Sequence, residues 1–456
     1  MTGSLLNDLA ALLGAERVAP FDARAMRDAL RGPAIAPRAD AVAYPESAEQ
    51  VAELVAWCYE RGVPLTARGG GTGLTGGATP VAGGVVVALE RLNRVRALDP
   101  GQWRMEAEAG VTTATVQRRA REAGLYFPPD PGAAEQSQLG GNVATNAGGP
   151  HALRYGTTGD FVTGLEVVLP PGELVRLGGP VRKDAAGFDL KRLLVGSEGA
   201  LGIITAAHLR LVPAPEARLP LVASFADARA GCEAVQAVLA SGVQASALEY
   251  LDGRTLELAG AALPGLDASG AGFLLIAEAD GTAEEAELQL AEIAAAVEPL
   301  AQLVVRPGGR EIGELWRWRD GVSNVVATAR GGKVSEDVAV PVERLADAIE
   351  ATLRIGAAHG LDACSWGHAG DGNIHATFLV SGDPAPADEL ERAEAAVDEL
   401  LREAVALGGT VSGEHGLGWL KRDALGHQAS AAELELQRRI KQAFDPKGLL
   451  NPGKWI

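Results

Sequence analysis

The chain has 456 residues, of which 47% are hydrophobic and 22% are charged, as expected of a globular protein with two or three domains. Its formal net charge of −18 argues against nucleic acid and anionic membranes as partners, so an anionic substrate would have to meet a local basic site. Three widely spaced cysteines, Cys58, Cys232 and Cys364, lack metal or redox spacing and indicate buried thiols in a reducing, cytoplasmic compartment.

The N-terminal segment MTGSLLNDLAALLG has no basic residues before its apolar part and carries Asp8 within it. This pattern predicts a short helix that ends at Gly14 rather than a signal peptide. No apolar run reaches the length of about 18 residues that a membrane span requires, so we expect no transmembrane segment.

Three segments rich in glycine and small polar residues follow in the first 212 residues. RGGGTGLTGG (68–77) comes after a short strand, and QLGGNVATNAGG (138–149) and GSEGALGIIT (196–205) come later. Glycine lets the backbone approach a phosphate closely, so three such loops indicate a long, bent ligand that contains a pyrophosphate. The first loop is neither a Walker loop nor a dinucleotide fingerprint, because it lacks Gly-Lys-Ser/Thr and no helix begins at its end. A flexible loop without a ligand is the structural alternative.

The second region has a different rhythm of elements. From LPLVASF to LVV the order is β-α-β-β-α-β, which is ferredoxin-like. A similar order returns after VSEDVAVP, with helices near 342–359 and 388–406. We therefore expect one large antiparallel sheet built from two related halves, followed by a turn-rich tail after about residue 430.

A concentration of histidines lies in the second half of this region. In His368-Ala-Gly-Asp-Gly-Asn-Ile-His375, a two-residue turn at Asp371 and Gly372 would pair His368 directly with His375, about 5 Å apart at Cβ. Two imidazoles at this separation suit one divalent metal, and SGEHG adds Glu414 and a third imidazole. A lone histidine is more often structural, and a glutamate in a loop is often only a surface carboxylate.

These motifs together resemble those of a known family. RGGGTG, GGNVATNAGG, RYGTTGD (154–160) and GSEGALGIIT resemble the FAD-binding domain of the vanillyl-alcohol oxidase, or PCMH, type. With HAGDGNIH, SGEHG and the terminal NPGK, the chain resembles the FAD-linked D-2-hydroxyacid dehydrogenases, which include D-lactate and D-2-hydroxyglutarate dehydrogenases and the flavin subunit of glycolate oxidase.

The resemblance implies an α+β fold with three parts. Residues 1–212 would form a two-subdomain FAD-binding domain, and residues 213–430 a cap, or substrate, domain with the ferredoxin-like antiparallel sheet and the metal site. Residues 431–456 would return to the FAD-binding domain.

The resemblance also implies roles for individual residues. His368, His375 and Glu414 match metal ligands, His415 matches the active-site base, and Arg319 in LWRWRD matches the arginine that grips the substrate carboxylate. Ser323 and Lys333 match further substrate-binding positions. The positions that match the family's FAD contacts are Arg68, Gly69, Gly70, Gly71, Thr72, Gly73, Leu74, Gly76, Pro131, Leu139, Gly140, Gly141, Asn142, Thr145, Asn146, Gly148, Gly149, Tyr155, Gly156, Glu198, Gly202, Ile204 and Asn451.

Two departures from the family pattern, and one difference from its covalent members, narrow these expectations. Lys333 lies two residues further from Pro341 than in the hydroxyglutarate enzymes, and Thr377 stands where an asparagine is usual. Both weaken the expectation of a large dicarboxylate substrate. The first loop reads RGGGT where covalent flavoproteins often carry histidine, so we expect non-covalent FAD.

The expected reaction is the oxidation of a D-2-hydroxyacid, of the D-lactate, glycolate or D-2-hydroxyglutarate class, to the 2-oxoacid. A divalent metal lowers the pKa of a coordinated hydroxyl, an imidazole takes its proton, a guanidinium holds the carboxylate, and hydride passes to flavin N5. Zinc is the favoured metal, with manganese and iron as alternatives.

Several functional alternatives stay open at this stage. They are an oxygen-using oxidase of the same fold, a non-catalytic flavin subunit, and a metal-dependent hydrolase that uses the histidines alone. The expected electron acceptor is an electron-transfer flavoprotein, a quinone or a cytochrome. The sequence does not decide whether the protein forms a homodimer. For Arg319, stacking against Trp316 and Trp318 is the structural alternative.

Overall fold

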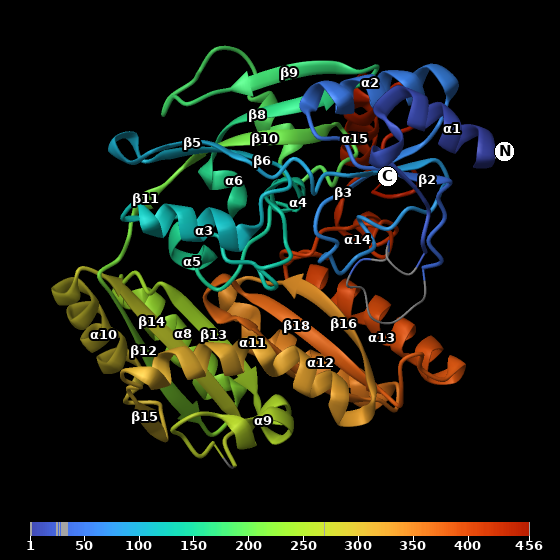
Figure 1. The fold of residues 1–456 in the computed structure, drawn as a ribbon. Coiled ribbons are helices and arrows are strands. Elements are labelled where there is room, and N and C mark those ends of the chain that lie inside the picture. The colour runs from blue at the N-terminus through green and yellow to red at the C-terminus, as the bar shows by residue number, and fades with distance from the viewer. Residues whose placement is uncertain (1, 24–25, 27, 29–34, 269, 456) are drawn as a thin grey trace.

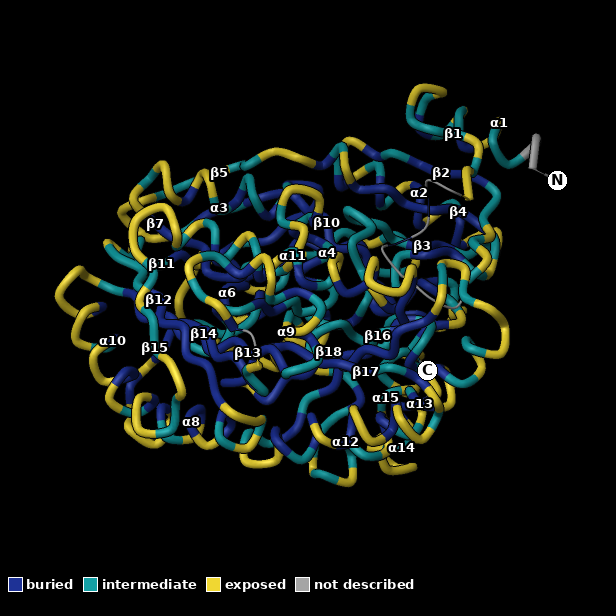
Figure 2. Tube along the Cα trace, turned by 90° about the horizontal axis from the view of Figure 1, so that it is seen from below, coloured by how far each residue is buried: buried dark blue, intermediate teal, exposed yellow. Residues whose placement is uncertain are grey.

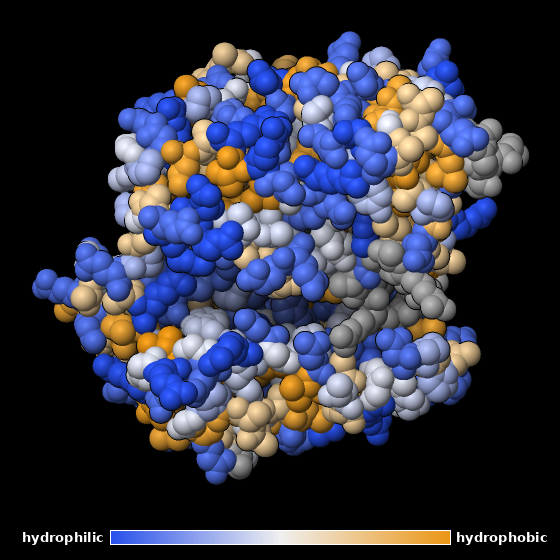
Figure 3. All heavy atoms as spheres, viewed as in Figure 1, coloured by the Kyte–Doolittle hydropathy of each residue, from blue (hydrophilic) through white to orange (hydrophobic). Residues whose placement is uncertain are grey.

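The computed structural model describes residues 2–23, 26, 28, 35–268 and 270–455. The chain forms two bodies, one built mainly from its first half and one from β12 to α13 (Figure 1). The face shown in Figure 3 is hollowed between the two bodies. Among the described residues, no helix is long and apolar enough to cross a membrane.

The first body contains two main sheets. A four-stranded sheet, in the order β1-β2-β4-β3, packs on α1 and α2 through a cluster that includes Val51, Leu54 and Val85. A five-stranded sheet follows in the order β5-β6-β10-β8-β9, and β7 pairs with β11 beside it. The elements of these sheets and their helices are α1 (Thr2–Leu13), β1 (Val18–Pro20), β2 (Ala41–Ala43), α2 (Ala48–Arg61), β3 (Leu65–Arg68), β4 (Val85–Ala88), β5 (Val95–Asp99), β6 (Arg104–Glu108), α3 (Thr113–Glu122), β7 (Leu125–Tyr126), α4 (Leu139–Thr145), α5 (Ala152–Tyr155), α6 (Thr158–Phe161), β8 (Val162–Leu169), β9 (Glu173–Gly178), α7 (Leu190–Leu194), β10 (Ile203–Arg210) and β11 (Val212–Pro213).

The helix α2 shows how the local sequence sets these bounds. The side chain of Ser47 accepts a hydrogen bond from the backbone of Gln50 at the first turn. Gly62 ends the helix in the left-handed conformation, with φ 67°, which glycine adopts without a Cβ penalty.

The second body is a seven-stranded sheet in the order β15-β12-β14-β13-β17-β18-β16. Its first four strands have the 4-1-3-2 order of a ferredoxin-like unit, and β16, β17 and β18 repeat the 1-3-2 part of that order. The two halves join where β13 pairs with β17. The elements are β12 (Ala217–Phe225), α8 (Ala228–Ser241), β13 (Ala247–Asp252), α9 (Gly253–Ala259), β14 (Phe273–Gly281), α10 (Ala283–Val297), β15 (Leu303–Val305), α11 (Arg310–Arg330), β16 (Gly332–Ala339), α12 (Leu345–Ala358), β17 (Asp362–His368), β18 (Asn373–Val380) and α13 (Ala387–Ala406).

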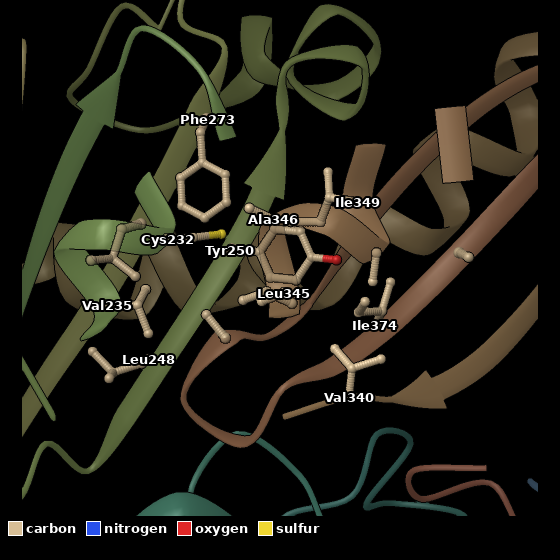
Figure 4. Packing of buried hydrophobic residues seen from close by; sticks show 14 of the residues in the cluster. Cys232, Val235, Leu248, Tyr250, Phe273, Val340, Leu345, Ala346, Ile349 and Ile374 are labelled. Atoms are coloured by element: carbon tan, nitrogen blue, oxygen red, sulfur yellow. The ribbon is translucent and has the colours of Figure 1, made fainter. Parts of the chain in front are cut away.

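The large sheet is covered on both faces. One face packs under α8, α10, α12 and α13, and the rings of Tyr250 and Phe273 stack there with centroids 5.4 Å apart. Figure 4 shows Tyr250 between Cys232 of the first half and Leu345 of the second, so this ring fills the junction of the two halves. The other face packs under α9 and α11, and its strands form a buried band in Figure 2. This second face also meets the first body.

The C-terminal residues pack against the first body. The helices α14 (Leu425–Gln428) and α15 (Ala431–Phe444) precede a tail in which Leu450 forms a parallel bridge with Leu65 of β3. The backbone N–H of Lys447 donates to the hydroxyl of Tyr59, 2.8 Å away. Backbone pairing therefore ties the end of the chain to the strand that precedes the first glycine loop.

Candidate active site

Three side chains bring metal-binding atoms together at the end of β17 and β18. Oε1 of Glu414 lies 3.5 Å from Nε2 of His368 and 3.5 Å from Nε2 of His375. One donor atom from each of the three residues lies within 4.8 Å of the others. Two imidazoles and one carboxylate that converge in this way suit a divalent metal with a further position open for substrate.

The hairpin that carries the two histidines differs from the expected one. The predicted direct pairing of His368 with His375 is wrong, because His368 pairs with Asn373 and His375 pairs with Trp366. The connection is longer than two residues, since a 3-10 turn at Ala369–Asp371 precedes Gly372. The pairing moves by two positions, and side chains alternate with a period of two, so both imidazoles stay on one face. Their ring centroids lie 5.4 Å apart.

Two of the three candidate ligands, Glu414 and His375, are already in the form that binds a metal. Burial favours the neutral form of Glu414, but the charge of His368 and its hydrogen bond with Glu414 outweigh burial, and the pKa of Glu414 falls to about 2. Burial is the main cause that lowers the pKa of His375 to about 3, so this imidazole is neutral. Burial also opposes the charged form of His368, yet the carboxylates of Glu249 and Glu414 hold its pKa well above the usual value. His368 would therefore release a proton when a metal binds, so metal binding at this cluster would depend on pH.

Asp337 on β16 holds the loop that presents Glu414 and His415. Its Oδ2 accepts hydrogen bonds from the backbone N–H groups of residues 413–415, each at 2.9 Å, and from the hydroxyl of Ser412. Its Oδ1 accepts from the side chain of Asn373. Asp337 also forms a second candidate metal group with His375 and His415, but its Oδ2 already accepts four hydrogen bonds and its Oδ1 accepts one. The group with Glu414 therefore fits a metal better.

Glu249 on β13 links His368 to Arg319. Its Oε1 lies 2.5 Å from Nδ1 of His368, and its Oε2 lies 2.5 Å from Nη2 of Arg319 on α11. The Glu249 side chain is fully buried, so it fixes the ring of His368 through the nitrogen that does not face Glu414. The motifs in the sequence did not identify Glu249 or Asp337 as site residues. For Glu249 the available signal was an acidic residue between apolar neighbours in ALEYL, whereas Asp337 lies beside Glu336 in VSEDVAVP and has no such signal.

Arg319 is buried and only partly paired. Its exposed fraction is 7%, and its Nε has no hydrogen-bond partner among the residues that the structure describes. A buried donor without a partner costs about 1–3 kcal/mol, so this atom favours an anionic ligand. The neighbouring Trp318 does not stack on it but donates its indole N–H to the carbonyl of Ala259.

Lys333 and Ser323 lie together on the same side of the sheet. Nζ of Lys333 donates to the hydroxyl of Ser323 at 2.7 Å and lies 4.8 Å from the ring centre of Trp366. The ring of Trp366 is next to that of His375, with centroids 6.2 Å apart. Thr377, one step further along β18, shares a hydrogen bond with Ser335. These groups form one edge of the site.

Some glycines of the loops pack tightly against the protein, and others border open space. A Cβ on Gly70 would lie 1.9 Å from the carbonyl oxygen of Gln136, and one on Gly140 would lie 2.6 Å from the Cβ of Ala109. By contrast, a Cβ on Gly141 would have no atom within 4 Å, and one on Gly73 would meet only Asp28, at 3.9 Å. This backbone leaves room for a ligand that approaches it closely, which fits the pyrophosphate of FAD.

The other residues that resemblance assigns to FAD lie along these loops and behind them. The first part of the second loop forms the short helix α4, which ends at Asn146 with φ 51°. Arg68 ends β3; the first loop continues with Gly69, Gly71, Thr72, Leu74 and Gly76; Leu139, Asn142 and Thr145 lie on α4; Pro131 precedes it, and Gly148, Gly149, Tyr155 and Gly156 follow it.

Four positions use their groups within the protein. The carboxylate of Glu198 accepts from the backbone N–H groups of Leu417 and Gly418, at 2.8 Å each. The side chain of Asn451 donates to the carbonyl oxygen of Glu198 at 2.7 Å. Gly202 and Ile204 lie in the packed interior of the five-stranded sheet. Glu198 therefore connects the third loop to the segment that follows His415.

The loops and the histidine cluster meet at the boundary of the two bodies. A Cβ on Gly148 would lie 3.2 Å from Oε2 of Glu414. The hydroxyl of Thr75, in the first loop, donates to the carbonyl oxygen of His415 at 3.3 Å. A ligand held by the loops is thus adjacent to the residues that would bind a metal.

Comparisons with known proteins agree with both halves of this arrangement. Residues 39–178 match the model of an FAD binding domain, and residues 214–455 match that of the C-terminal domain of FAD linked oxidases. The chain is 37% identical over 418 residues to the glycolate oxidase subunit GlcD of Bacillus subtilis (91% of this chain, 88% of the relative). It is 33% identical over 423 residues to a D-lactate dehydrogenase of Anaerostipes hadrus (90% of this chain, 87% of the relative).

Solved structures support the fold. The 4-ethylphenol oxidase of Gulosibacter chungangensis superposes with a TM-score of 0.79 at 21% identity, over 99% of this chain and 96% of that one. The p-cresol methylhydroxylase gives 0.78 at 20% identity, with the same coverage. The expected α+β fold, with an FAD-binding domain of the vanillyl-alcohol oxidase type, is confirmed.

Proposed function

The chain belongs to the family of FAD-linked oxidases that contains the glycolate oxidase subunit GlcD and D-lactate dehydrogenases, and we propose that it is an FAD-linked dehydrogenase of a small D-2-hydroxyacid. Glycolate and D-lactate are the first candidate substrates. The observation that carries this proposal is the convergence of His368, His375 and Glu414 next to the glycine loops and Arg319.

Two bound groups would complete the site. FAD, held without a covalent bond by the loops at 68–77 and 138–149, supplies the acceptor for the two electrons that leave the substrate. A divalent metal, zinc in first place and manganese or iron as alternatives, supplies positive charge that stabilises a deprotonated hydroxyl, and His368, His375 and Glu414 would hold it.

Arg319 would bind the carboxylate of the substrate. One side of its guanidinium is engaged by Glu249, and its Nε lacks a hydrogen-bond partner among the described residues. A carboxylate would satisfy this donor by a charge-assisted hydrogen bond. Because Glu249 also contacts His368, it would keep a fixed relation between the carboxylate and the hydroxyl of the substrate.

His415 would take the proton of the substrate hydroxyl. Its ring stacks on that of His375 with centroids 5.3 Å apart, and its side chain is 21% exposed. Its Nε2 lies 3.8 Å from Oε1 of Glu414, on the border of the metal-binding cluster. The carbon at position 2 then loses its hydrogen with two electrons, and the product is the 2-oxoacid.

Lys333 and Ser323 would border the side chain of the substrate. The ammonium group of Lys333 is already engaged by Ser323 and the ring of Trp366. These contacts would hold the ammonium group beside the position of the substrate side chain.

Anaerobic titration of the purified holoprotein tests this function. Glycolate and the D and L forms of lactate, malate and 2-hydroxyglutarate are added one at a time, and the loss of the visible absorption of oxidised flavin is followed. We expect D-lactate or glycolate to reduce the flavin and L-lactate to fail. A protein that stays colourless after incubation with FAD, or a flavin that no hydroxyacid reduces, contradicts the proposal. Comparing reoxidation by oxygen with reoxidation by an artificial acceptor separates an oxidase from a dehydrogenase.

A further inference from the structure

A second buried histidine crosses the boundary between the two bodies. His151, whose exposed fraction is 5%, lies just after the second glycine loop, in a segment without a recognisable motif. Its Nδ1 lies 2.5 Å from Oδ2 of Asp130 in the first body, and its Nε2 lies 2.9 Å from Oε1 of Glu278 on β14. A single imidazole therefore joins carboxylates of both bodies.

Glu278 is the point where three elements meet. Besides His151, its carboxylate accepts from the hydroxyl of Ser246, before β13, at 3.0 Å, and from the indole N–H of Trp316 on α11 at 2.8 Å. The rings of His151 and Trp316 are also adjacent, with centroids 5.8 Å apart. Trp316 is therefore held by a carboxylate that also contacts an imidazole of the other body.

Trp316 and Arg319 stand three residues apart on α11, so they project from neighbouring positions of one helix face. Their partners on the sheet, Glu278 and Glu249, are also neighbours of each other. Glu249 pairs with Ile276 on β14, and Glu278 lies two residues beyond Ile276, so the two glutamates are diagonal neighbours on one face. Each glutamate thus holds one residue of α11: Glu278 holds Trp316, and Glu249 holds Arg319.

We propose that His151 is a positioning residue, which through Glu278 and Trp316 sets the placement of α11, and hence of Arg319, relative to the flavin-binding loops. This inference rests on the proposed role of Arg319 in binding the substrate carboxylate.

The segment that carries His151 also contacts the metal-binding cluster, through Gly148. Gly148 lies against Glu414, and His151 follows three residues later. Gly149, with φ 125°, packs against Asp130, so a side chain there would collide with the carboxylate that holds His151. The segment 148–151 therefore spans the metal-binding residues and the support of the carboxylate clamp, and it aligns the two.

The charge state of His151 is consistent with this role. Burial works to lower its pKa, but the charge of Asp130 and the hydrogen bonds with both carboxylates outweigh it and raise the pKa to about 10. The imidazole is thus a cation at neutral pH and balances Glu278, whose pKa is held below its usual value by His151 despite its burial.

The test compares steady-state kinetics and ligand binding of four variants with those of the wild-type holoprotein. In His151→Gln, we expect the KM for D-lactate or glycolate to rise about 10-fold while kcat changes less, because a misplaced clamp weakens carboxylate binding. Oxalate, titrated against the flavin spectrum, should bind more weakly by a similar factor. FAD content should not change.

Three further variants, Glu278→Gln, a double variant and His359→Asn, separate positioning from general damage. The double variant His151→Gln/Glu278→Gln should be no worse than the worse single variant, since both changes break the same contact. His359→Asn removes a matched pair with Glu399, at 3.0 Å, on the outer helices of the second body and should leave the KM unchanged. A fall in kcat at constant KM, additive losses in the double variant, or an equal rise in KM for His359→Asn would overturn the inference.

The outcomes also distinguish this inference from the proposed function. If the wild-type protein neither oxidises a hydroxyacid nor binds oxalate, the proposed function fails. If the wild type does both and His151→Gln matches it, the function stands and the positioning role of His151 is refuted.

Discussion

Two buried clusters of histidine and carboxylate lie on the same side of the large sheet and differ in how their polar atoms are satisfied. Around Glu414, the distances to His368 and His375 are 3.5 Å, longer than a charged hydrogen bond. Around His151, both ring nitrogens lie within 2.9 Å of a carboxylate oxygen. The first cluster converges on a point that a cation would fill, whereas the second is already complete as an ion pair.

Residue type alone therefore does not identify a metal site. Both clusters contain buried imidazoles and carboxylates, and the distances decide between a site for an ion and a fixed support. If this distinction is right, removing a metal or a ligand should affect the first cluster strongly, and the second cluster should respond mainly to protonation.

The largest effect is expected for His375→Ala. Turnover should fall by more than about 100-fold, above the loss that substitutions outside the ligand shell cause, because one of three ligands is removed. FAD should stay bound, since His375 lies outside the glycine loops. Activity, metal content and flavin absorbance are measured on the same sample. A parallel loss of flavin and activity would contradict two separate sites, and His208→Ala, on β10 of the first body, serves as the control.

Arg319→Leu tests the clamp residue on α11, the helix that contacts both clusters through Glu249 and Glu278. The KM for a 2-hydroxyacid should rise about 100-fold, equivalent to ~3 kcal/mol, because a charge-assisted hydrogen bond is lost. Arg319→Lys keeps a positive charge beside Glu249, so its KM should lie between that of the wild type and that of Arg319→Leu. An unchanged KM in Arg319→Leu would refute the clamp.

Asp337→Asn should give a moderate effect. The loop of residues 413–415 would lose the charge that accepts its three N–H groups, so Glu414 and His415 would be held less firmly. We expect kcat and metal affinity each to fall about 10-fold, as for residues that orient metal ligands. Equilibrium dialysis with zinc measures the affinity. A normal affinity for zinc with a reduced kcat would show that Asp337 orients His415 but not Glu414.

The smallest effect concerns stability and pH at the second cluster. The pKa of His151 is raised from its ordinary value of 6.5 to about 10, so its contribution to stability is fully present below about pH 6.5 and is lost as the pH rises through 10. The charged groups that face it are Asp130, Glu278 and Asp320. Urea unfolding should show a difference between wild type and His151→Gln that shrinks from pH 6.5 to 10.5. A constant difference would show that packing, not charge, carries it.

Local patterns in the sequence predicted much of the fold. The alternation of strands and helices indicated two related halves, and glycine and small polar residues marked the three loops. The separation between His368 and His375 was sufficient to place them on one face, although the register was wrong by two. The length of a turn depends on its backbone conformation, which the Asp-Gly pair did not fix.

The contacts that organise the site could not be predicted from sequence spacing. Glu249 and His368 are 119 residues apart, and His151 and Glu278 are 127 apart. They meet because of strand order and of how the two bodies pack, which no local pattern encodes. An acidic residue inside an apolar strand marks such a position, but it does not identify its partner.

The junction of the two halves of the sheet has a consequence for folding. Glu249 and His368 are directly opposite each other across the junction. Glu249 lies on β13, the edge strand of the first half, and His368 lies on β17, the neighbouring strand of the second half. Neither half alone contains both residues, so an intermediate with only one folded half would lack an oriented ligand set. Metal affinity is thus coupled to the cooperative unit that spans both halves, and ion uptake would report the last step of assembly.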